Sequence, residues 1–300
     1  MGDINVFSIN EDVSQLSPSS FQLERELQML IENNMSTFFG VTFLQSEFSI
    51  PSGRIDSLGI DENYCPVIFE YKRSQNENVI NQGLFYLDWL MDHKAEFKLL
   101  TIEKLGMKIA NKIDWSIPCV ICIANDFTKF DEHAVNQMQK NIKLIKYKKF
   151  GNDLILFEQI NTPIIKPIVE GNEGGMSIKK VADKTFAEQL EGTSNELRET
   201  YYSIRDYILS LGDDVSENQL KLYTAFKNIR NIVCVEIRQK TILLYLRLNP
   251  NNYLEEQEAG LVRDVSNIGH WGTGDLEITL KSADEFEQIK YLIDQSYNEN

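Results

Sequence analysis

One segment constrains the fold more than any other, because it combines two strand patterns, a tight connection and a helix pattern. It covers residues 53–86 and reads GRIDSLGIDENYCPVIFEYKRSQNENVINQGLFY. Apolar and other residues alternate over 66–73, which predicts a strand, and the run over 54–60 predicts a partner strand in a hairpin. A helix pattern follows, from about residue 76 to residue 97. One hairpin and one helix therefore carry most of the candidate functional residues.

Two carboxylates and a lysine gather on one face of this hairpin. Side chains on a strand alternate between faces, so Glu70 and Lys72 are neighbours on the second strand. Pairing of the two strands brings Asp56 close to Glu70. Such a group is costly, since like charges repel and burial disfavours ionisation. A divalent cation removes the cost, because oxygen ligands suit magnesium and an adjacent lysine can hold or deprotonate an attacking water.

The pattern Asp56, then Glu70-x-Lys72, then Gln82-x-x-x-Tyr86 resembles the PD-(D/E)xK nuclease superfamily. It is most similar to the NucS-like and RecB-like branch, which shares the Gln/Tyr helix. An acidic-x-Lys triplet alone has little specificity, but here it lies on a strand after a hairpin that carries an aspartate. The alternatives are a surface hairpin with an ordinary Glu–Lys pair and a nuclease fold that binds without cleaving.

The resemblance covers roughly residues 20–160 and implies a Mg²⁺- or Mn²⁺-dependent DNA endonuclease. It implies that Asp56 and Glu70, with the backbone carbonyl of Tyr71, hold the metal ion. Lys72 is then expected to orient or activate the water and to stabilise charge on the phosphate. Spacing does not determine whether one or two ions bind.

Three further residues enter the site through the same resemblance. Gln82 and Tyr86 share a helix face and are expected to reach towards the water or the phosphate, although Tyr86 also fits a hydrophobic core. The helix expected over 21–34 supplies a glutamate in the resembling family. Glu24 and Glu26 both flank its apolar stripe, and Glu26 is favoured on resemblance.

A local excess of lysine predicts a surface that faces nucleic acid. Residues 98–150 hold ten lysines and five acidic residues, a local charge of +5. The alternative is a solvated strand edge protected by lysine. The candidate nucleic-acid-binding residues are Lys143, Lys146, Lys148, Lys149 and Arg73.

The whole chain carries a net charge of −15, which argues against indiscriminate binding of nucleic acid. Its composition, 42% hydrophobic and 25% charged, is that of a globular chain. No apolar run approaches a membrane span and the N-terminal segment lacks the basic and apolar regions of a signal peptide, so we expect a cytoplasmic protein without a membrane partner.

Strand and helix patterns alternate through the first half of the chain, which predicts an α/β fold with a restriction-endonuclease-like mixed sheet flanked by helices. We expect this nuclease-like domain over residues 1–165 and a Gly-rich linker over 166–180. A smaller α+β domain is expected over 181–300, with a short helix over 217–228.

The second domain resembles a small domain of unknown function sometimes labelled predicted transport protein, on the stretch VSNIGHWGTGDLEITL. It shows no catalytic constellation, so a binding or dimerisation module is expected, holding a second copy or a partner protein. The complete chain is expected to be a DNA endonuclease in repair, restriction or phage defence, with DNA as its partner. The alternative is a non-cleaving nucleic-acid-binding or regulatory subunit.

Overall fold

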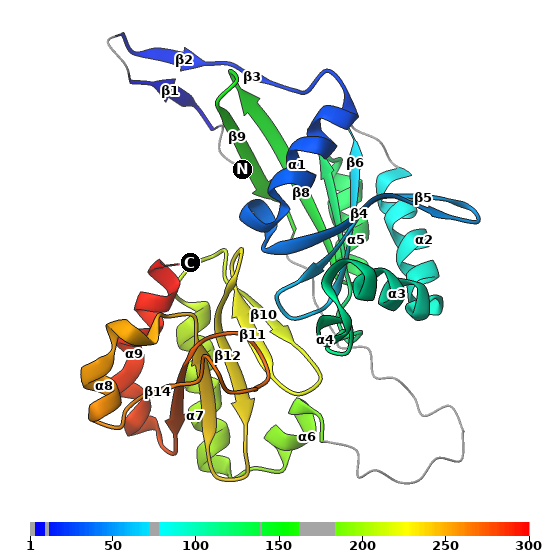
Figure 1. Cartoon of the computed structure of the whole chain (residues 1–300). Coiled ribbons are helices and arrows are strands. Elements are labelled where there is room, and N and C mark those ends of the chain that lie inside the picture. Colours follow the sequence, from blue (N-terminus) through cyan, green and yellow to red (C-terminus); the bar gives the residue numbers. More distant parts are fainter. Residues whose placement is uncertain (1–3, 10–11, 73–77, 139, 162–183, 300) are drawn as a thin grey trace, which may run out of the picture. The chain divides into compact units, whose positions relative to one another are not determined.

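The structure is a computed structural model that describes residues 4–9, 12–72, 78–138, 140–161 and 184–299 (Figure 1). Contacts divide the chain into two compact units, Met1–Ile113 with Pro118–Ile164, and Asp114–Ile117 with Ile165–Asn300. The linker expected over 166–180 and the candidate residue Arg73 lie outside the described residues. Within the described ranges, no helix has both the length and the apolar character that crossing a membrane requires.

The first unit is built on a seven-stranded mixed sheet with the order β3-β8-β7-β6-β5-β4, in which β9 also pairs with β8. The strands are β3 (Pro18–Ser19), β4 (Val41–Ile50), β5 (Gly53–Asp61), β6 (Pro66–Lys72), β7 (Cys119–Ala124), β8 (Ile142–Phe150) and β9 (Leu154–Gln159). β5 and β6 form the expected antiparallel hairpin, whereas β6, β7 and β8 run parallel. A separate two-stranded ribbon, β1 (Val6–Ser8) with β2 (Ser14–Leu16), precedes this sheet.

Helices cover both faces of the sheet. They are α1 (Glu24–Phe39), α2 (Asn78–Asp92), α3 (Lys94–Leu105), α4 (Met107–Ala110) and α5 (Lys129–Gln137). α1 buries Leu27 and Ile31 in one cluster with Phe69 and Tyr71 of β6. α2 approaches the opposite face, where the Cys122 thiol lies 3.9 Å from the carbonyl oxygen of Val79. Figure 1 shows α1 and α2 on the two sides of the strands. The expected α/β fold class is confirmed.

The sequence placed one helix over 76–97, and the structure corrects this to two. α2 ends at Asp92 and α3 begins at Lys94, with His93 between them in a non-helical conformation (φ −119°, ψ 42°). The His93 ring stacks on Trp89 with centroids 4.2 Å apart. The apolar pattern continues through the break, so periodicity alone did not reveal it.

The second unit contains a six-stranded antiparallel sheet with the order β10-β11-β12-β13-β15-β14. Its strands are β10 (Ser216–Gln219), β11 (Thr224–Lys227), β12 (Asn231–Ile237), β13 (Ile242–Leu246), β14 (Arg263–Asp264) and β15 (Leu276–Leu280). Its helical segments are α6 (Phe186–Glu191), α7 (Asn195–Leu209), η1 (Pro250–Asn252), α8 (Leu254–Glu258) and α9 (Ala283–Asn298). The helix expected over 217–228 is wrong. That segment forms β10 and β11, because cross-strand pairing with β12 overrides a weak local pattern.

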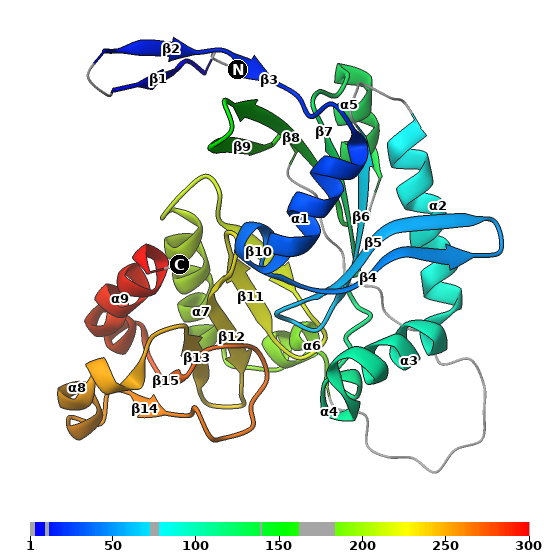
Figure 2. The ribbon, with the colours of Figure 1, turned by 45° about the horizontal axis from the view of Figure 1, so that its top comes forward.

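The core of the second unit lies between its sheet and two helices. α7 buries Tyr201 and Ile204, α9 buries Phe286 and Leu292, and both pack on strand residues such as Val235. Figure 2 shows α7 and α9 beside the strands of this unit. The fold gives this unit its own hydrophobic core, which independent domains require.

Gly83 sets how closely α2 approaches the sheet, and this generates a stability prediction. A Cβ atom at this position would lie 2.6 Å from Cγ1 of Val120. We expect Gly83→Ala to lower the free energy of unfolding by roughly 1–3 kcal/mol, although alanine favours helix by about 1 kcal/mol. Urea denaturation measures the change.

Val120→Ala provides the control for this interpretation, because it removes the methyl group that the new Cβ would meet. In a double-mutant cycle, the cost of Gly83→Ala should shrink in the Val120→Ala background. Equal costs in both backgrounds would contradict a steric origin.

Candidate functional site

The candidate site lies where β5 and β6 separate. Their ladder extends from Ile60↔Pro66 to Ser57↔Phe69 and goes no further. Beyond that point β6 pairs with β7 as far as Lys72↔Ala124, and the first residues of β5 pair with β4. The hairpin therefore opens into a fork, and Asp56 and Glu70 are the first residues past its last rung.

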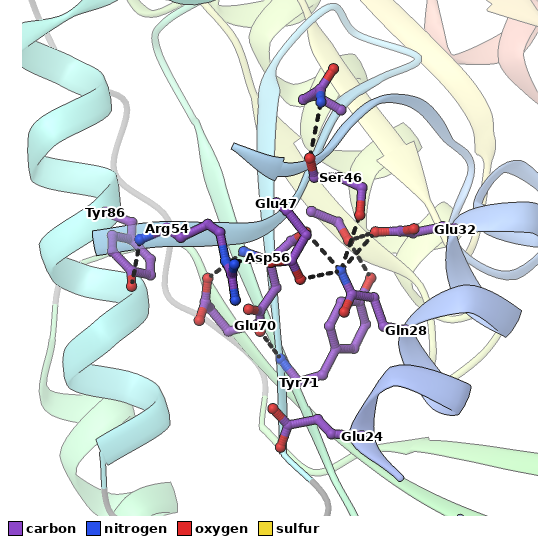
Figure 3. Close-up of polar contacts among 12 residues, drawn as sticks. Glu24, Gln28, Glu32, Ser46, Glu47, Arg54, Asp56, Glu70, Tyr71 and Tyr86 are labelled. Carbon is purple, nitrogen blue, oxygen red and sulfur yellow. Dashed lines mark hydrogen bonds and ion pairs between the residues drawn. The ribbon is translucent and has the colours of Figure 1, made fainter. Parts of the chain in front are cut away.

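Two reciprocal hydrogen bonds join the arms of this fork (Figure 3). The backbone N–H of Asp56 donates to Oε1 of Glu70 at 3.2 Å. The backbone N–H of Tyr71 donates to Oδ2 of Asp56 at 3.0 Å. Each carboxylate thus takes a backbone donor from the other strand where strand pairing has ended, and the Glu70 side chain is almost fully buried. The structure thus places Asp56 next to Glu70, as the strand pairing predicted from the sequence requires.

Burial controls the protonation of both acids. Loss of solvent, together with the neighbouring charge of Asp56, raises the pKa of Glu70 to about 9. Loss of solvent also raises the pKa of Asp56, although the Tyr71 N–H and Lys72 oppose that shift. Two such carboxylates do not both ionise near neutral pH unless a positive charge compensates them. The fork therefore favours a cation or a shared proton.

Lys72 is held at the end of β6 by a carboxylate from α1. Its Nζ lies 3.4 Å from Oε1 of Glu24. The preference for Glu26 is corrected, because the Glu26 carboxylate instead accepts from the backbone N–H of Leu23 at 3.3 Å, at the start of α1. Residues two apart on a helix point in very different directions, so only the rotation of α1 about its axis could choose between the two.

Tyr86 and Gln82 occupy different positions on α2. The Tyr86 hydroxyl accepts from the backbone N–H of Arg54 at 3.4 Å, and the ring packs against Gly53, so it braces the start of β5 near Asp56. The side-chain oxygen of Gln82 is buried and has no hydrogen-bond partner among the described residues. Their expected roles towards water or phosphate stay predictions.

Two residues that sequence reasoning missed complete the fork. The register pairs Ser46 with Ser57 and Phe48 with Ile55, which puts Glu47 of β4 opposite Asp56. Extending strand pairing from the turn at residues 51–52 would have found it.

The second missed residue is Gln28 of α1. Its Nε2 donates to Oε1 of Glu47 at 3.2 Å and to the backbone oxygen of Asp56 at 3.0 Å. The same nitrogen also lies 3.0 Å from Oε1 of Glu32 and 3.2 Å from Oγ of Ser46, so its two hydrogens are shared among four acceptors. Gln28 therefore ties α1 to both β4 and β5 behind the acids.

The four lysines of β8 do not form one rim. Strand alternation divides them, with Lys143 and Lys149 on one face and Lys146 and Lys148 on the other. Nζ of Lys146 lies 2.7 Å from Oδ1 of Asp126, in an ion pair whose aspartate is exposed and whose lysine is largely shielded. Nζ of Lys149 donates to the Asn152 side chain at 3.3 Å. Their role in binding nucleic acid stays a prediction, and it involves two surfaces rather than one.

The donor set fits a divalent ion that takes part of its coordination from other oxygens. Among the residues that the structure describes, no three His, Cys, Asp or Glu side chains form a group that could hold a metal. Asp56 and Glu70 nevertheless supply two neighbouring carboxyl groups, and Mg²⁺ accepts one or two carboxylates with water and other oxygens.

The raised pKa of Glu70 predicts how stability depends on pH without a metal. The group titrates near 9 in the folded protein and near 4.5 ordinarily, so between these values the folded state binds more protons than the unfolded chain. Stability should therefore fall as pH rises through that interval. Glu70→Gln should remove this dependence and raise the free energy of unfolding at pH 8 by roughly 1–3 kcal/mol.

Urea denaturation in EDTA at several pH values measures the effect. Glu96→Gln, at an exposed position on α3, is the matched control and should follow the wild type. A Glu70→Gln variant that loses stability at pH 8 would contradict the assigned cost of burial.

Comparison with known proteins gives one match over the whole chain. A protein of Haemophilus influenzae (strain KW20 / Rd) described as an "uncharacterized protein" is 37% identical over 291 residues, which is 95% of this chain and 96% of that protein. The profile of DUF5655, a domain of unknown function, matches residues 186–300.

Two solved structures align with part of this chain. A repair endonuclease from Pyrococcus abyssi aligns with 47% of this chain and 65% of its own, at 16% identity and a TM-score of 0.28. EndoMS in complex with double-stranded DNA aligns with 48% of this chain and 64% of its own, at 16% identity and a TM-score of 0.29. Less than two thirds of each of those chains is matched. The chain belongs to the family of the Haemophilus influenzae protein.

Proposed function

We propose that the first unit is a PD-(D/E)xK-type nuclease that hydrolyses phosphodiester bonds in DNA with Mg²⁺ or Mn²⁺. The observation that carries the proposal is the pair of reciprocal hydrogen bonds at the fork, which hold Asp56 and Glu70 together with Lys72 two residues further along β6. Bringing the partly buried Asp56 against the buried Glu70 has a stability cost that a structural role does not explain. DNA as the substrate rests on the sequence resemblance.

In this proposal Asp56 and Glu70, with the backbone carbonyl of Tyr71, hold the metal ion. The bound ion would neutralise phosphate oxygens and favour ionisation of water. The ammonium group of Lys72 lies at the open end of the fork, where it orients the attacking water and stabilises charge that builds on the phosphate.

Glu24 acts in this scheme as a positioning residue for Lys72. The Lys72 side chain is about 18% exposed, so it is largely shielded from solvent while Glu24 holds its Nζ. Gln28 positions the strands rather than a side chain, because its hydrogen bonds to Glu47 and to the backbone oxygen of Asp56 hold β4 and β5 behind the acids. A hydrolytic centre needs such support, because small displacements of catalytic groups reduce rates strongly.

The alternative is a protein that binds DNA on this fold without cutting it. One observation favours it: the described residues contain no group of three potential side-chain ligands for a metal. An activity panel over single-stranded, duplex, flap and mismatched DNA with Mg²⁺ or Mn²⁺ separates the two functions. A binding protein would retain DNA and release no product.

The proposed centre predicts the loss of cleavage in single variants. Asp56→Asn, Glu70→Gln and Lys72→Ala should each reduce Mn²⁺-dependent cleavage by at least about 100-fold, since each removes a group that acts at the reacting phosphate. The control uses another acidic-x-Lys triplet, Glu96-x-Lys98 on α3, where Glu96→Gln should cut like wild type.

A second readout does not depend on activity. Mn²⁺ should raise the Tm of the wild type, and the increase should be lost in Asp56→Asn and Glu70→Gln. Site variants that cut DNA as fast as the wild type would refute the assignment.

The corrected helix residue gives a separate test. Glu24→Gln should lower kcat by roughly 3- to 30-fold with little effect on KM, because it loosens Lys72 without touching substrate. Glu26→Gln should leave kcat unchanged, since its carboxylate accepts a hydrogen bond from the backbone N–H of Leu23 at the start of its own helix. If Glu26→Gln lowers kcat and Glu24→Gln does not, Glu26 rather than Glu24 is the helix carboxylate of the site.

A further inference from the structure

A second cation lies at the open end of the fork, on the arm opposite Lys72. Arg54 precedes Asp56 by two residues on β5, just as Lys72 follows Glu70 by two on β6. In an unbroken antiparallel ladder these two residues would face each other, but the strands diverge here. Arg54 therefore lies with β4 and Lys72 with β7. A phosphodiester backbone that crosses the open end meets one cation on each arm.

Each cation is held by a carboxylate from a third element. Lys72 pairs with Glu24 of α1. Nε of Arg54 forms an ion pair with Oε2 of Glu47, and Figure 3 shows Arg54 and Glu47 beside Asp56. The Arg54 side chain is 62% exposed and that of Glu47 is 38% exposed. No other partner of the Arg54 side chain is found among the described residues. Lys72 is enclosed, whereas Arg54 is accessible to a ligand from solvent.

The backbone at Glu47 is held in an unfavourable conformation. Its φ of 54° lies in the left-handed region, in the middle of the ten-residue strand β4. That region costs a non-glycine residue about 1–2 kcal/mol. Gln28 donates to Oε1 of the same carboxylate at 3.2 Å, so two side chains hold Glu47 in this position. Strain maintained in this way is typical of functional sites.

The pairing with Glu47 is weak enough for a phosphate to replace it. Exposed ion pairs contribute only about 0–1 kcal/mol, because water screens them. The planar guanidinium group of Arg54 can instead make two parallel hydrogen bonds to phosphate oxygens, which are stronger. Glu47 would keep its hydrogen bond from Gln28 after the exchange.

We propose that the guanidinium group of Arg54 binds the phosphate of a nucleotide next to the scissile bond. Without DNA this group pairs with the Glu47 carboxylate, and the DNA phosphate replaces Glu47 when DNA binds. The inference rests on the proposed DNA substrate. It assigns Arg54 to substrate positioning and makes Glu47 a competitor of the substrate. The exchange limits binding of stray anions, in keeping with the net charge of −15.

DNA affinity measured in a Glu70→Gln background, which cannot turn over, tests the inference. Fluorescence anisotropy with a labelled 20-base-pair duplex gives Kd at several salt concentrations. Arg54→Ala should weaken binding by about 5- to 30-fold and reduce the slope of log Kd against log salt by about one. Arg54→Lys should keep the salt slope and lose part of the affinity, since it preserves charge without the planar group.

Glu47→Gln distinguishes exchange from simple attraction. It should tighten binding by about 3- to 10-fold when Arg54 is present and have a much smaller effect in an Arg54→Ala background. Lys290→Ala, which breaks the Lys290–Glu287 ion pair on α9, outside the lysine-rich segment 98–150, is the control and should leave Kd unchanged. Circular dichroism checks that the variants are folded.

The outcomes separate this inference from the nuclease proposal. If the wild type cleaves DNA but Arg54→Ala leaves Kd and the salt slope unchanged, the subsite is wrong and the nuclease stands. If the wild type never cleaves while Arg54→Ala weakens binding as expected, the subsite stands and the nuclease is wrong. Absence of DNA binding in the parent variant, or equal effects of Glu47→Gln in both backgrounds, overturns the exchange.

Discussion

The separation of β5 from β6 is the constraint on which the candidate site depends. Up to Ser57 and Phe69 the two strands pair in register, and beyond them their backbones diverge. At the fork, hydrogen bonds from backbone N–H groups to the two carboxylates take the place of strand pairing. They hold the Asp56 side chain next to that of Glu70. The fork therefore stabilises the end of the hairpin and concentrates negative charge there. These two effects oppose each other in the stability of the metal-free protein.

Support for the fork comes from both faces of the sheet. On one side, Gln28 and Glu32 of α1 form a polar layer that reaches the Ser57 hydroxyl, which lies 2.6 Å from Oε1 of Glu32. The Tyr71 hydroxyl donates to the same serine at 3.1 Å. On the other side, Tyr86 of α2 braces the start of β5. Polar groups that are satisfied in this way specify a single arrangement of nearby strands.

The second unit differs in character from the first. Its sheet is antiparallel throughout and its two long helices share one core with it. In the loop before β15, the His270 ring stacks on Tyr245 with centroids 4.3 Å apart, and Gly272 adopts a φ of 82° against Cys234. These contacts make His270 part of a tight packed turn. The chemistry proposed for the chain accordingly lies in the first unit.

The sequence by itself determined the α/β class, the hairpin and the presence of two acids and a lysine on it. These features follow from alternation with a period of two, which is a local property. Tertiary structure decided the rest. The choice of Glu24 over Glu26 depended on the rotation of α1 about its own axis. Glu47 reaches Asp56 only through pairing between strands, so its position is a property of the sheet rather than of any single segment.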